Sequence, residues 1–260
     1  MKLIILLALV NFSVHAQRLS AEAVSYQKIS ADRFWGVDAY ENLYYSTDNV
    51  LFKFNKEQDS ILHKFNDFNL GNLTSVDLIN PLKIVLFYQD SNTVVFLDNR
   101  LNERNRFSFN QIQPLRTLSQ ARLAGNRHLW LFNIDTQRIE VFDYIDKETT
   151  KQSLPINSNI NQFVTSFIKT WVVLTDELRV YDWYANQIKT ISKSFDQIAV
   201  HKHQVVGLSA SGNYFYKEKG KDFIKLSNLK QDSESFYLMN QKLYIYQQNK
   251  LSIYKITQKP

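Results

Sequence analysis

A short apolar segment recurs along the chain, and this repeat is the strongest constraint on the fold. Neighbouring copies lie about 35–45 residues apart, which is the period of propeller blades built of four β-strands each. Each copy ends at a polar or charged residue, as a strand does when it runs into a turn. The six copies are Leu51–Asn55, Val94–Asp98, Ile139–Asp143, Leu178–Asp182, Asn213–Lys217 and Leu251–Lys255.

A second apolar segment precedes each copy across a short polar turn. In the first unit, Leu43–Ser46 is separated from Leu51–Asn55 by a turn that contains Asp48 and Asn49, residue types that accept turn dihedrals. No sustained helical periodicity follows residue 16. We therefore predict an all-β fold: a six-bladed β-propeller of four-stranded antiparallel blades.

The two ends of the chain indicate how the ring closes. The sixth unit stops at its third strand, Lys250–Ile256, and lacks a fourth. An unattached strand, Val24–Ser30, stands before the first full unit. As the outer strand of the last blade, it covers an edge that is otherwise open to pairing with another chain. The N-terminal strand is therefore predicted to complete the last blade.

The first unit, residues 36–65, carries a recognisable blade pattern. Its matching positions are Val37-Asp38, Asn42-Leu43-Tyr44, Leu51 and Lys53-Phe54. With these residues the unit resembles blades of the NHL-like and TolB-like six-bladed propellers. The resemblance implies an architecture for the whole chain, and its motif is a signature of folding that specifies no active site.

The first 16 residues form the pattern of a secretory signal peptide. Lys2 is followed by the apolar run Leu3–Val10, and small residues flank His15 before an expected cleavage site at Gln17. The apolar run is shorter than the ~20 residues that a membrane helix needs. We predict a cleaved signal over residues 1–16, one propeller domain over residues 17–260, and no transmembrane segment in the mature chain.

The amino-acid composition indicates which compartment and which classes of partner suit the protein. The chain has no cysteine, which excludes disulfides and a lipid-modified cysteine, and its 44% hydrophobic residues are enough for a core without them. A bacterial periplasm or cell surface suits such an exported protein. The 31 basic and 25 acidic residues are dispersed, so nucleic acid is not an expected partner. The mild net positive charge leaves open a peripheral association with the outer membrane.

Catalytic and metal-binding patterns are sparse. The sequence has no cysteine nucleophile, nucleophile elbow, P-loop or dinucleotide fingerprint. His201 and His203 have the only metal-like spacing, and no third ligand is evident nearby, so we expect neither a metal nor another cofactor. Asp38 and Asp77 are expected beside the central channel, where turn capping is their favoured role.

Candidate binding residues come from loop positions. Bulky residues in the connections between blades are Phe68, Ile112, Leu115 and Arg116, and the pair Trp183-Tyr184 follows a third strand. Loops on a rigid scaffold carry most binding functions, and Trp and Tyr anchor protein interfaces. For Trp183 and Tyr184, covering the rim of the core between blades is an equally good interpretation.

Three functions remain open at this point. The favoured one is a non-catalytic exported scaffold for protein interactions in a bacterial cell-envelope assembly. The second is a module that binds a glycan or small ligand in the channel. The third is a propeller hydrolase or lyase, which requires Asp38, Asp77, His201 and His203 to converge at the channel mouth.

Overall fold

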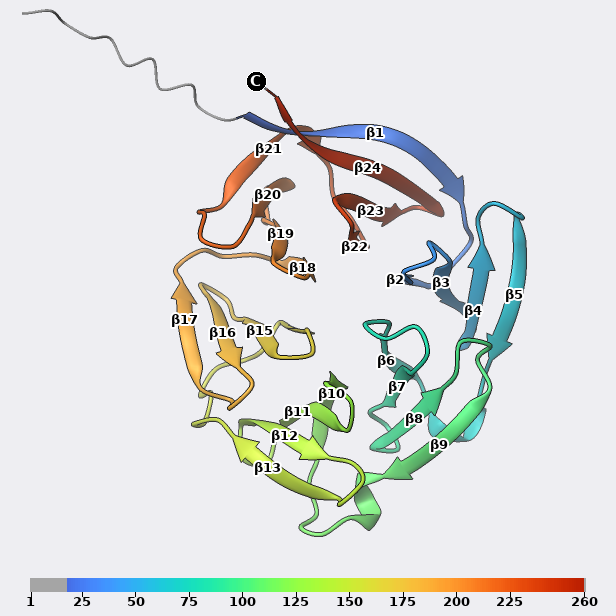
Figure 1. Cartoon of the computed structure of the whole chain (residues 1–260), viewed down its shortest axis with the longest axis vertical. Helices are drawn as coiled ribbons and strands as arrows, with labels where there is room; N and C mark the ends of the chain where they lie inside the picture. The colour runs from blue at the N-terminus through green and yellow to red at the C-terminus, as the bar shows by residue number, and fades with distance from the viewer. Residues whose placement is uncertain (1–17, 260) are drawn as a thin grey trace, which may run out of the picture.

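The strands form a ring around a central channel (Figure 1). The computed structural model describes residues 18–259 and contains 24 strands and two short 3₁₀ helices. The predicted signal peptide lies outside the described residues. Within the described part of the chain, no helix is long and apolar enough to cross a membrane.

Four of the sheets are separate blades, each with four strands in chain order and antiparallel neighbours. Unit 1 consists of β2 (Arg33–Val37), β3 (Leu43–Thr47), β4 (Val50–Asn55) and β5 (Ser60–Phe65). Unit 2 consists of β6 (Leu73–Asp77), β7 (Ile84–Tyr88), β8 (Thr93–Leu97) and β9 (Glu103–Ser108). Unit 3 consists of β10 (Leu118–Ala124), β11 (His128–Asn133), β12 (Arg138–Asp143) and β13 (Glu148–Gln152). Unit 4 consists of β14 (Gln162–Thr165), β15 (Lys169–Val173), β16 (Leu178–Asp182) and β17 (Gln187–Ile191).

The remaining strands form one eight-stranded sheet, which corrects the prediction of six separate blades. Unit 5 of this sheet consists of β18 (Gln197–His201), β19 (Gln204–Leu208), β20 (Asn213–Lys217) and β21 (Ile224–Lys230). Unit 6 consists of β22 (Ser235–Met239), β23 (Lys242–Gln247), β24 (Lys250–Lys259) and β1 (Arg18–Lys28). The two units join because Ser20 of β1 also pairs, in parallel, with Ser227 of β21. Four blades are therefore separate, and the other two four-stranded units share a sheet.

The closing role of the N-terminal strand is confirmed. β1 runs antiparallel to β24 from Arg18↔Lys259 to Lys28↔Lys250, and the two strands lie side by side at the perimeter (Figure 1). β1 begins earlier than the predicted strand, Val24–Ser30. The additional residues place Ala21 in the core between units 5 and 6, against side chains of β21 and β23.

Burial decreases from the middle of each unit outward. Every residue of β7 and β8 is buried, whereas β9 at the perimeter is mostly exposed. The apolar side chains of adjacent units meet in shared clusters, such as Phe96 and Phe109 with Phe142 and Tyr144 at the junction of units 2 and 3. The 3₁₀ helices η1 (Phe68–Leu70) and η2 (Phe109–Gln111) lie in the connections between units.

The ring has two faces, which we name by their loops. The linker face carries the connections between units and the turns between second and third strands. The opposite face carries the turns from first to second strands and from third to fourth strands. This division follows from the up-and-down order of the strands in every unit.

The docking of β1 can be tested with two substitutions on that strand. Ala21 is 4% exposed and Val24 is 57% exposed. We expect Ala21→Asp to lower the free energy of unfolding by about 3–5 kcal/mol, because it leaves an uncompensated charge in the core. Val24→Asp is the matched control and changes it by about 0.5 kcal/mol or less. Equal effects of the two substitutions in denaturant unfolding contradict this position of β1.

Candidate functional site

One type of turn recurs on the opposite face. In the turns Asp38–Asn42, Asp98–Asn102 and Asp182–Asn186, the aspartate Oδ1 accepts the N–H groups of the residues two and four positions later. The aspartate N–H donates to the asparagine carbonyl at 2.9–3.1 Å in all three. These bonds satisfy most polar backbone groups of the turn from within, so the turn has a defined shape without outside support.

The shape of this turn presents one side chain to solvent. The residue two positions after the aspartate is Tyr40, Arg100 or Tyr184, and all three are exposed. A related turn begins at Asp143, whose Oδ1 accepts the N–H of Ile145 at 2.9 Å, and Ile145 is also exposed. Units 1–4 thus each contribute one projecting residue to the opposite face, three of them large and apolar.

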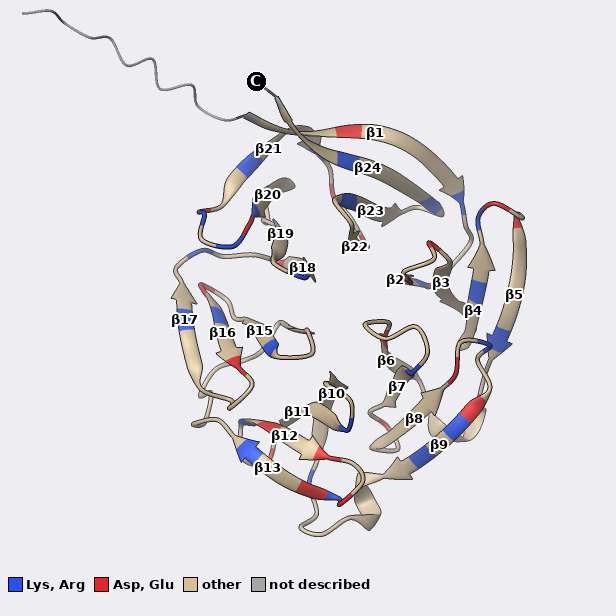
Figure 2. Cartoon of the chain, in the orientation of Figure 1, with Lys and Arg blue, Asp and Glu red and all other residues tan. Residues whose placement is uncertain are grey.

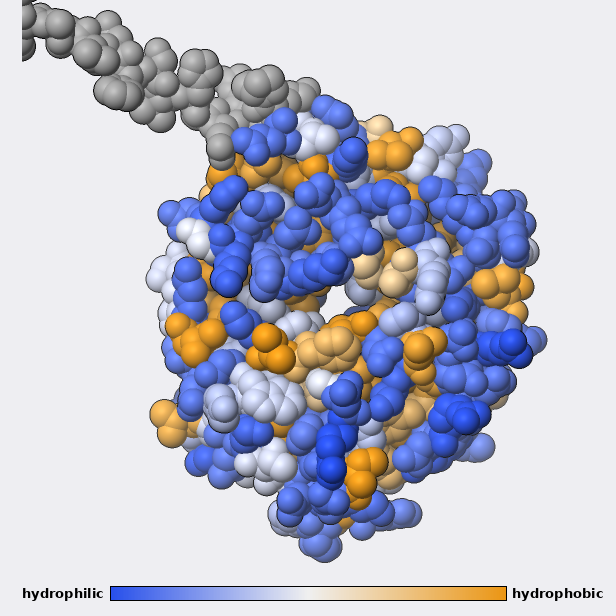
Figure 3. Space-filling view, viewed as in Figure 1, coloured by the Kyte–Doolittle hydropathy of each residue, from blue (hydrophilic) through white to orange (hydrophobic). Residues whose placement is uncertain are grey.

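Other turns of this face add to its apolar character. Leu82, Phe167 and Ile168 are exposed in turns between first and second strands. Figure 3 shows one face of the molecule with separate apolar patches around the open channel, divided by hydrophilic groups. Large apolar side chains on rigid turns, surrounded by polar groups, are typical of protein-binding surfaces.

Trp183 and Tyr184 have different environments. The Trp183 ring packs edge-on against His128 and Trp130 of unit 3, with centroids 5.1 and 5.9 Å apart. Lys151 Nζ lies 4.7 Å from the Trp183 centroid and 5.8 Å from that of Tyr184. Trp183 therefore covers the junction of units 3 and 4, whereas Tyr184 is 64% exposed. Of the pair, only Tyr184 offers most of its surface to a partner.

The other predicted binding residues lie on the linker face. Phe68 in η1 and Leu115 are exposed, but Ile112 and Arg116 are buried. The structure thus divides the candidates between two faces and does not bring them into one site. Sequence reasoning missed Tyr40; the recurring Asp-x-x-x-Asn spacing was the signal that would have indicated it.

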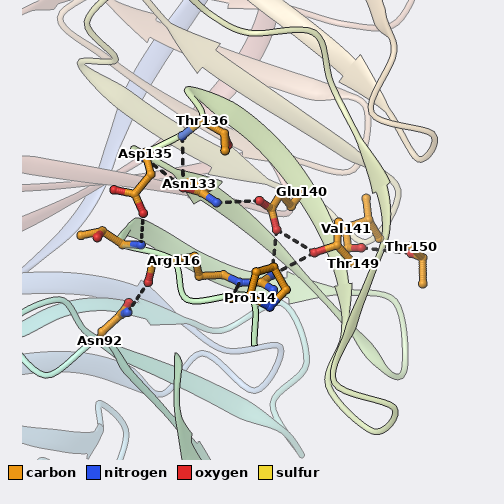
Figure 4. A network of polar contacts seen from close by, with 11 residues as sticks. Asn92, Pro114, Arg116, Asn133, Asp135, Thr136, Glu140, Val141, Thr149 and Thr150 are labelled. Atoms are coloured by element: carbon orange, nitrogen blue, oxygen red, sulfur yellow. Dashed lines mark hydrogen bonds and ion pairs between the residues drawn. The ribbon is translucent and has the colours of Figure 1, made fainter. Parts of the chain in front are cut away.

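Arg116 belongs to a buried polar network instead of a docking surface (Figure 4). Its guanidinium Nη1 donates to Glu140 Oε2 at 2.8 Å and to Thr149 Oγ1 at 2.9 Å. Asn133 Nδ2 donates to the other oxygen of Glu140 at 2.8 Å, and Asn92 Nδ2 donates to the Arg116 carbonyl at 2.7 Å. The network joins the linker between units 2 and 3 to both units, so Arg116 has a structural role.

The network predicts a non-additive response to substitution. We expect Arg116→Met to lower the free energy of unfolding by about 3–5 kcal/mol, because the Glu140 carboxylate then remains buried without its partner. The double variant Arg116→Met/Glu140→Met removes both charges and is expected to be the more stable of the two. Denaturant unfolding of both variants measures the difference, and a double variant that is less stable than the single one contradicts this role for the ion pair.

The residues needed for the hydrolase alternative do not converge. Asp38 is fully buried and bonds within its own unit, to Asn42, to Tyr44 at 3.0 Å and to Lys53 at 3.3 Å. Its capping role is confirmed. Asp77 lines the central channel, whereas the two histidines line a separate pocket between units 5 and 6. These residues therefore do not form the single site that the hydrolase alternative requires.

The histidine pocket has poor metal-binding chemistry. His201 Nδ1 accepts the N–H of Asn240 at 3.2 Å, and Lys202 and Lys219 line the same pocket as the two histidines. Burial, and then the charge of Lys202, lower the pKa of His201. Across residues 18–259, no three His, Asp or Glu side chains are grouped so that they could hold a metal ion.

Charge is mixed over the ring. Lys and Arg are interspersed with Asp and Glu over the strands and turns of the ring, as Figure 2 shows. Several surface cations are paired, such as Arg106 with Asp67 and Glu103, and Arg127 with Asp143 and Asp146. No element in this view carries the extended single-sign stripe that is typical of nucleic-acid binding.

Comparisons with known proteins support the fold. No family model matches the chain, and no curated protein matches it in sequence. Solved structures match in shape. A β-propeller domain of Cps50 (Swd1) from Myceliophteria thermophila has a TM-score of 0.64 at 10% identity, covering 91% of this chain and 100% of that one. The WD40 domain of Neurospora crassa Pan2 has a TM-score of 0.59 at 9% identity, covering 86% and 74%.

A third match is a chain from the crystal structure of a mitotic checkpoint complex, with a TM-score of 0.63, 7% identity and 98% coverage of both chains. At these identities the likeness shows a β-propeller fold alone. It does not confirm the NHL-like or TolB-like type that the first unit resembles.

Proposed function

We propose that this protein is a non-catalytic interaction scaffold that docks a protein partner on its opposite face. The observation that carries the proposal is the set of projecting side chains, Tyr40, Ile145 and Tyr184, each held by an aspartate-bonded turn in a different unit. Such turns present a side chain with little loss of conformational entropy on binding, because the backbone is already fixed.

The spacing of the projecting residues around the ring suits a broad partner. The side chains come from units 1, 3 and 4, with Leu82 of unit 2 between them in chain order. Tyr in a polar surround is a frequent anchor of protein interfaces. That one similar solved chain comes from a multiprotein complex is in keeping with a scaffold role.

We further propose that the protein is exported to a bacterial periplasm or cell surface, where it belongs to an envelope assembly. The support is the signal-like pattern of residues 1–16 and the absence of cysteine. Peripheral contact with the outer membrane, and kinship with the NHL-like or TolB-like propellers through the pattern of unit 1, belong to the same proposal.

The docking face is tested by capture of partners from native envelope extracts, followed by mass spectrometry. We expect the double variant Ile145→Asp/Tyr184→Asp to recover at least about tenfold less partner than the wild type, because it removes two anchors. The matched control is Phe68→Asp/Leu115→Asp on the linker face, which is expected to retain the partner. A reversed result assigns docking to the linker face, and recovery of no specific partner by the wild type contradicts the scaffold function.

Export is tested separately. We expect fractionation of the native host to place the protein outside the cytoplasm, with an intact mass that corresponds to a chain starting at Gln17. Replacing Leu6 and Leu7 with Lys interrupts the apolar run and is expected to retain an uncleaved cytoplasmic protein. A full-length, cytoplasmic wild type rules out the export proposal and leaves the docking face untouched.

A further inference from the structure

The central channel contains a cavity of about 420 Å³ that the innermost strands of the units enclose. Its volume lies within the range of small-molecule sites. The open channel is visible through the middle of the molecule in Figure 3. Among the residues that line it are Arg33, Asp77, Arg122 and Tyr237, which come from units 1, 2, 3 and 6.

Arg122 has no direct partner in the described part of the chain. Its Nε atom is buried without a hydrogen bond, and no ion pair within 4 Å engages its guanidinium. Burial lowers the pKa of Arg122, and the charge of Asp77 opposes this effect. Arg122 as a whole is half-buried and lines the channel, so its Nε donor is unused and the rest of its guanidinium is open to a ligand.

Asp77 is the nearest carboxylate, but it is engaged elsewhere. Its Oδ1 accepts the N–H of Ile79 and its Oδ2 accepts the N–H of Leu123, both at 2.9 Å. Burial raises the pKa of Asp77, while the Arg122 charge acts in the other direction. Asp77 therefore caps the end of β6 and fastens it to β10, and it leaves the hydrogen-bonding capacity of Arg122 unused.

Arg33 brings a second cation to the channel wall. Its guanidinium carbon lies 4.2 Å from the Trp35 ring centroid, and its Nη1 donates to the Thr74 carbonyl at 3.4 Å. Burial lowers the pKa of Arg33, and the field of Arg122 lowers it further. Both guanidinium groups line the same cavity, and an anion bound there would offset the repulsion between their charges.

Tyr237 faces the same part of the channel because unit 1 has a glycine opposite it. Gly36 has φ +141°, and a Cβ atom there would lie 2.5 Å from Cδ2 of the Tyr237 ring. Any larger residue would displace the ring. Burial raises the pKa of the Tyr237 hydroxyl, and Asp77 raises it further, so the hydroxyl stays protonated and able to donate.

Apart from Asp77, the acidic residues that line the channel lie toward the linker face. Asp32, Asp196 and Glu234 stand at or just before the starts of the innermost strands. Asp32 accepts the N–H of Asp48 at 2.7 Å, and Glu234 accepts the N–H of Gln248 at 2.9 Å, so both bond to turns of that face. Neither of these two carboxylates forms a hydrogen bond or ion pair with Arg122.

We propose that the channel binds the oxyanion group of a small molecule, a carboxylate or a phosphate, with Arg122 as its main contact and with Arg33 and the Tyr237 hydroxyl as further donors. Guanidinium groups match the geometry of both oxyanions. This site is independent of protein docking on the opposite face.

The test is calorimetric titration of the full chain with inorganic phosphate and, separately, with succinate, at an ionic strength held constant with sodium chloride. We expect saturable one-site binding of at least one probe, and the stronger of the two identifies the oxyanion. Arg122→Gln is expected to weaken that binding at least tenfold. Arg104→Gln, the same change at an exposed position of the perimeter strand β9, is expected to leave it unchanged.

Two further measurements keep the result interpretable. Arg122→Gln is expected to lose the rise in thermal midpoint that the probe gives the wild type, and this loss is measured against the variant's own midpoint without probe. Arg33→Gln is expected to weaken binding to a smaller extent. Absence of saturable binding, or equal binding by wild type and Arg122→Gln, overturns the proposal. Arg122→Gln still captures the protein partner if the docking proposal holds.

Discussion

The pairing of β1 with β24 is the constraint on which the rest of the ring depends. It supplies the fourth strand of unit 6 and covers the edge of β24. The junction of units 6 and 1 depends on this pairing, because the residues that follow β1 contact β23 of unit 6. There the Tyr246 hydroxyl donates to the Ala31 carbonyl at 2.7 Å and accepts the Ala31 N–H at 3.1 Å. Ser235 Oγ adds a bond to the Phe34 carbonyl at 3.1 Å. The ends of the chain thus hold together the two units that are farthest apart in sequence.

Polar side chains around the channel repeat this task at the other junctions. A side chain from the innermost strand of one unit reaches the backbone at the next unit in most of them: Arg33 to Thr74, Ser75 to Ala121, Gln162 to Ile198, and Gln197 to Ser233. At the junction of units 3 and 4, Trp130 Nε1 donates to the Ser166 carbonyl from the second strand instead. Most polar side chains of the channel wall therefore have a structural role, since they bond one unit to the next. Arg122 differs because, among the described residues, its guanidinium makes no hydrogen bond to another unit.

The strands could be predicted from the sequence because short apolar segments recur at a regular spacing and are separated by polar turns. The closure was predictable as well, because an extra strand at one end matched a missing one at the other. The fused sheet was not predictable, since it depends on one pairing, Ser20 with Ser227, that no local pattern encodes. Loop position alone also failed to separate Phe68 from Arg116. Both lie in linkers, but one is exposed and the other is drawn inward by the Glu140 carboxylate, a contact made 24 residues farther along the chain.

The two proposed binding regions share a physical logic that sets them apart from the rest of the molecule. In the turns of the opposite face, the aspartates accept hydrogen bonds from backbone N–H groups and so fix the backbone before a partner binds. Tyr40 and Tyr184 can therefore contribute contact area with little further loss of conformational entropy. In the channel, Asp77 likewise satisfies two backbone groups, and the Nε donor of the neighbouring Arg122 is left without an acceptor in the described part of the chain. In both places, internal bonds of aspartates fix the surroundings, and the side chain beside them is free for something outside the chain. The charge of Arg122 favours the ionised form of the buried Asp77 carboxylate, while the hydrogen-bonding capacity of its guanidinium remains available to a ligand.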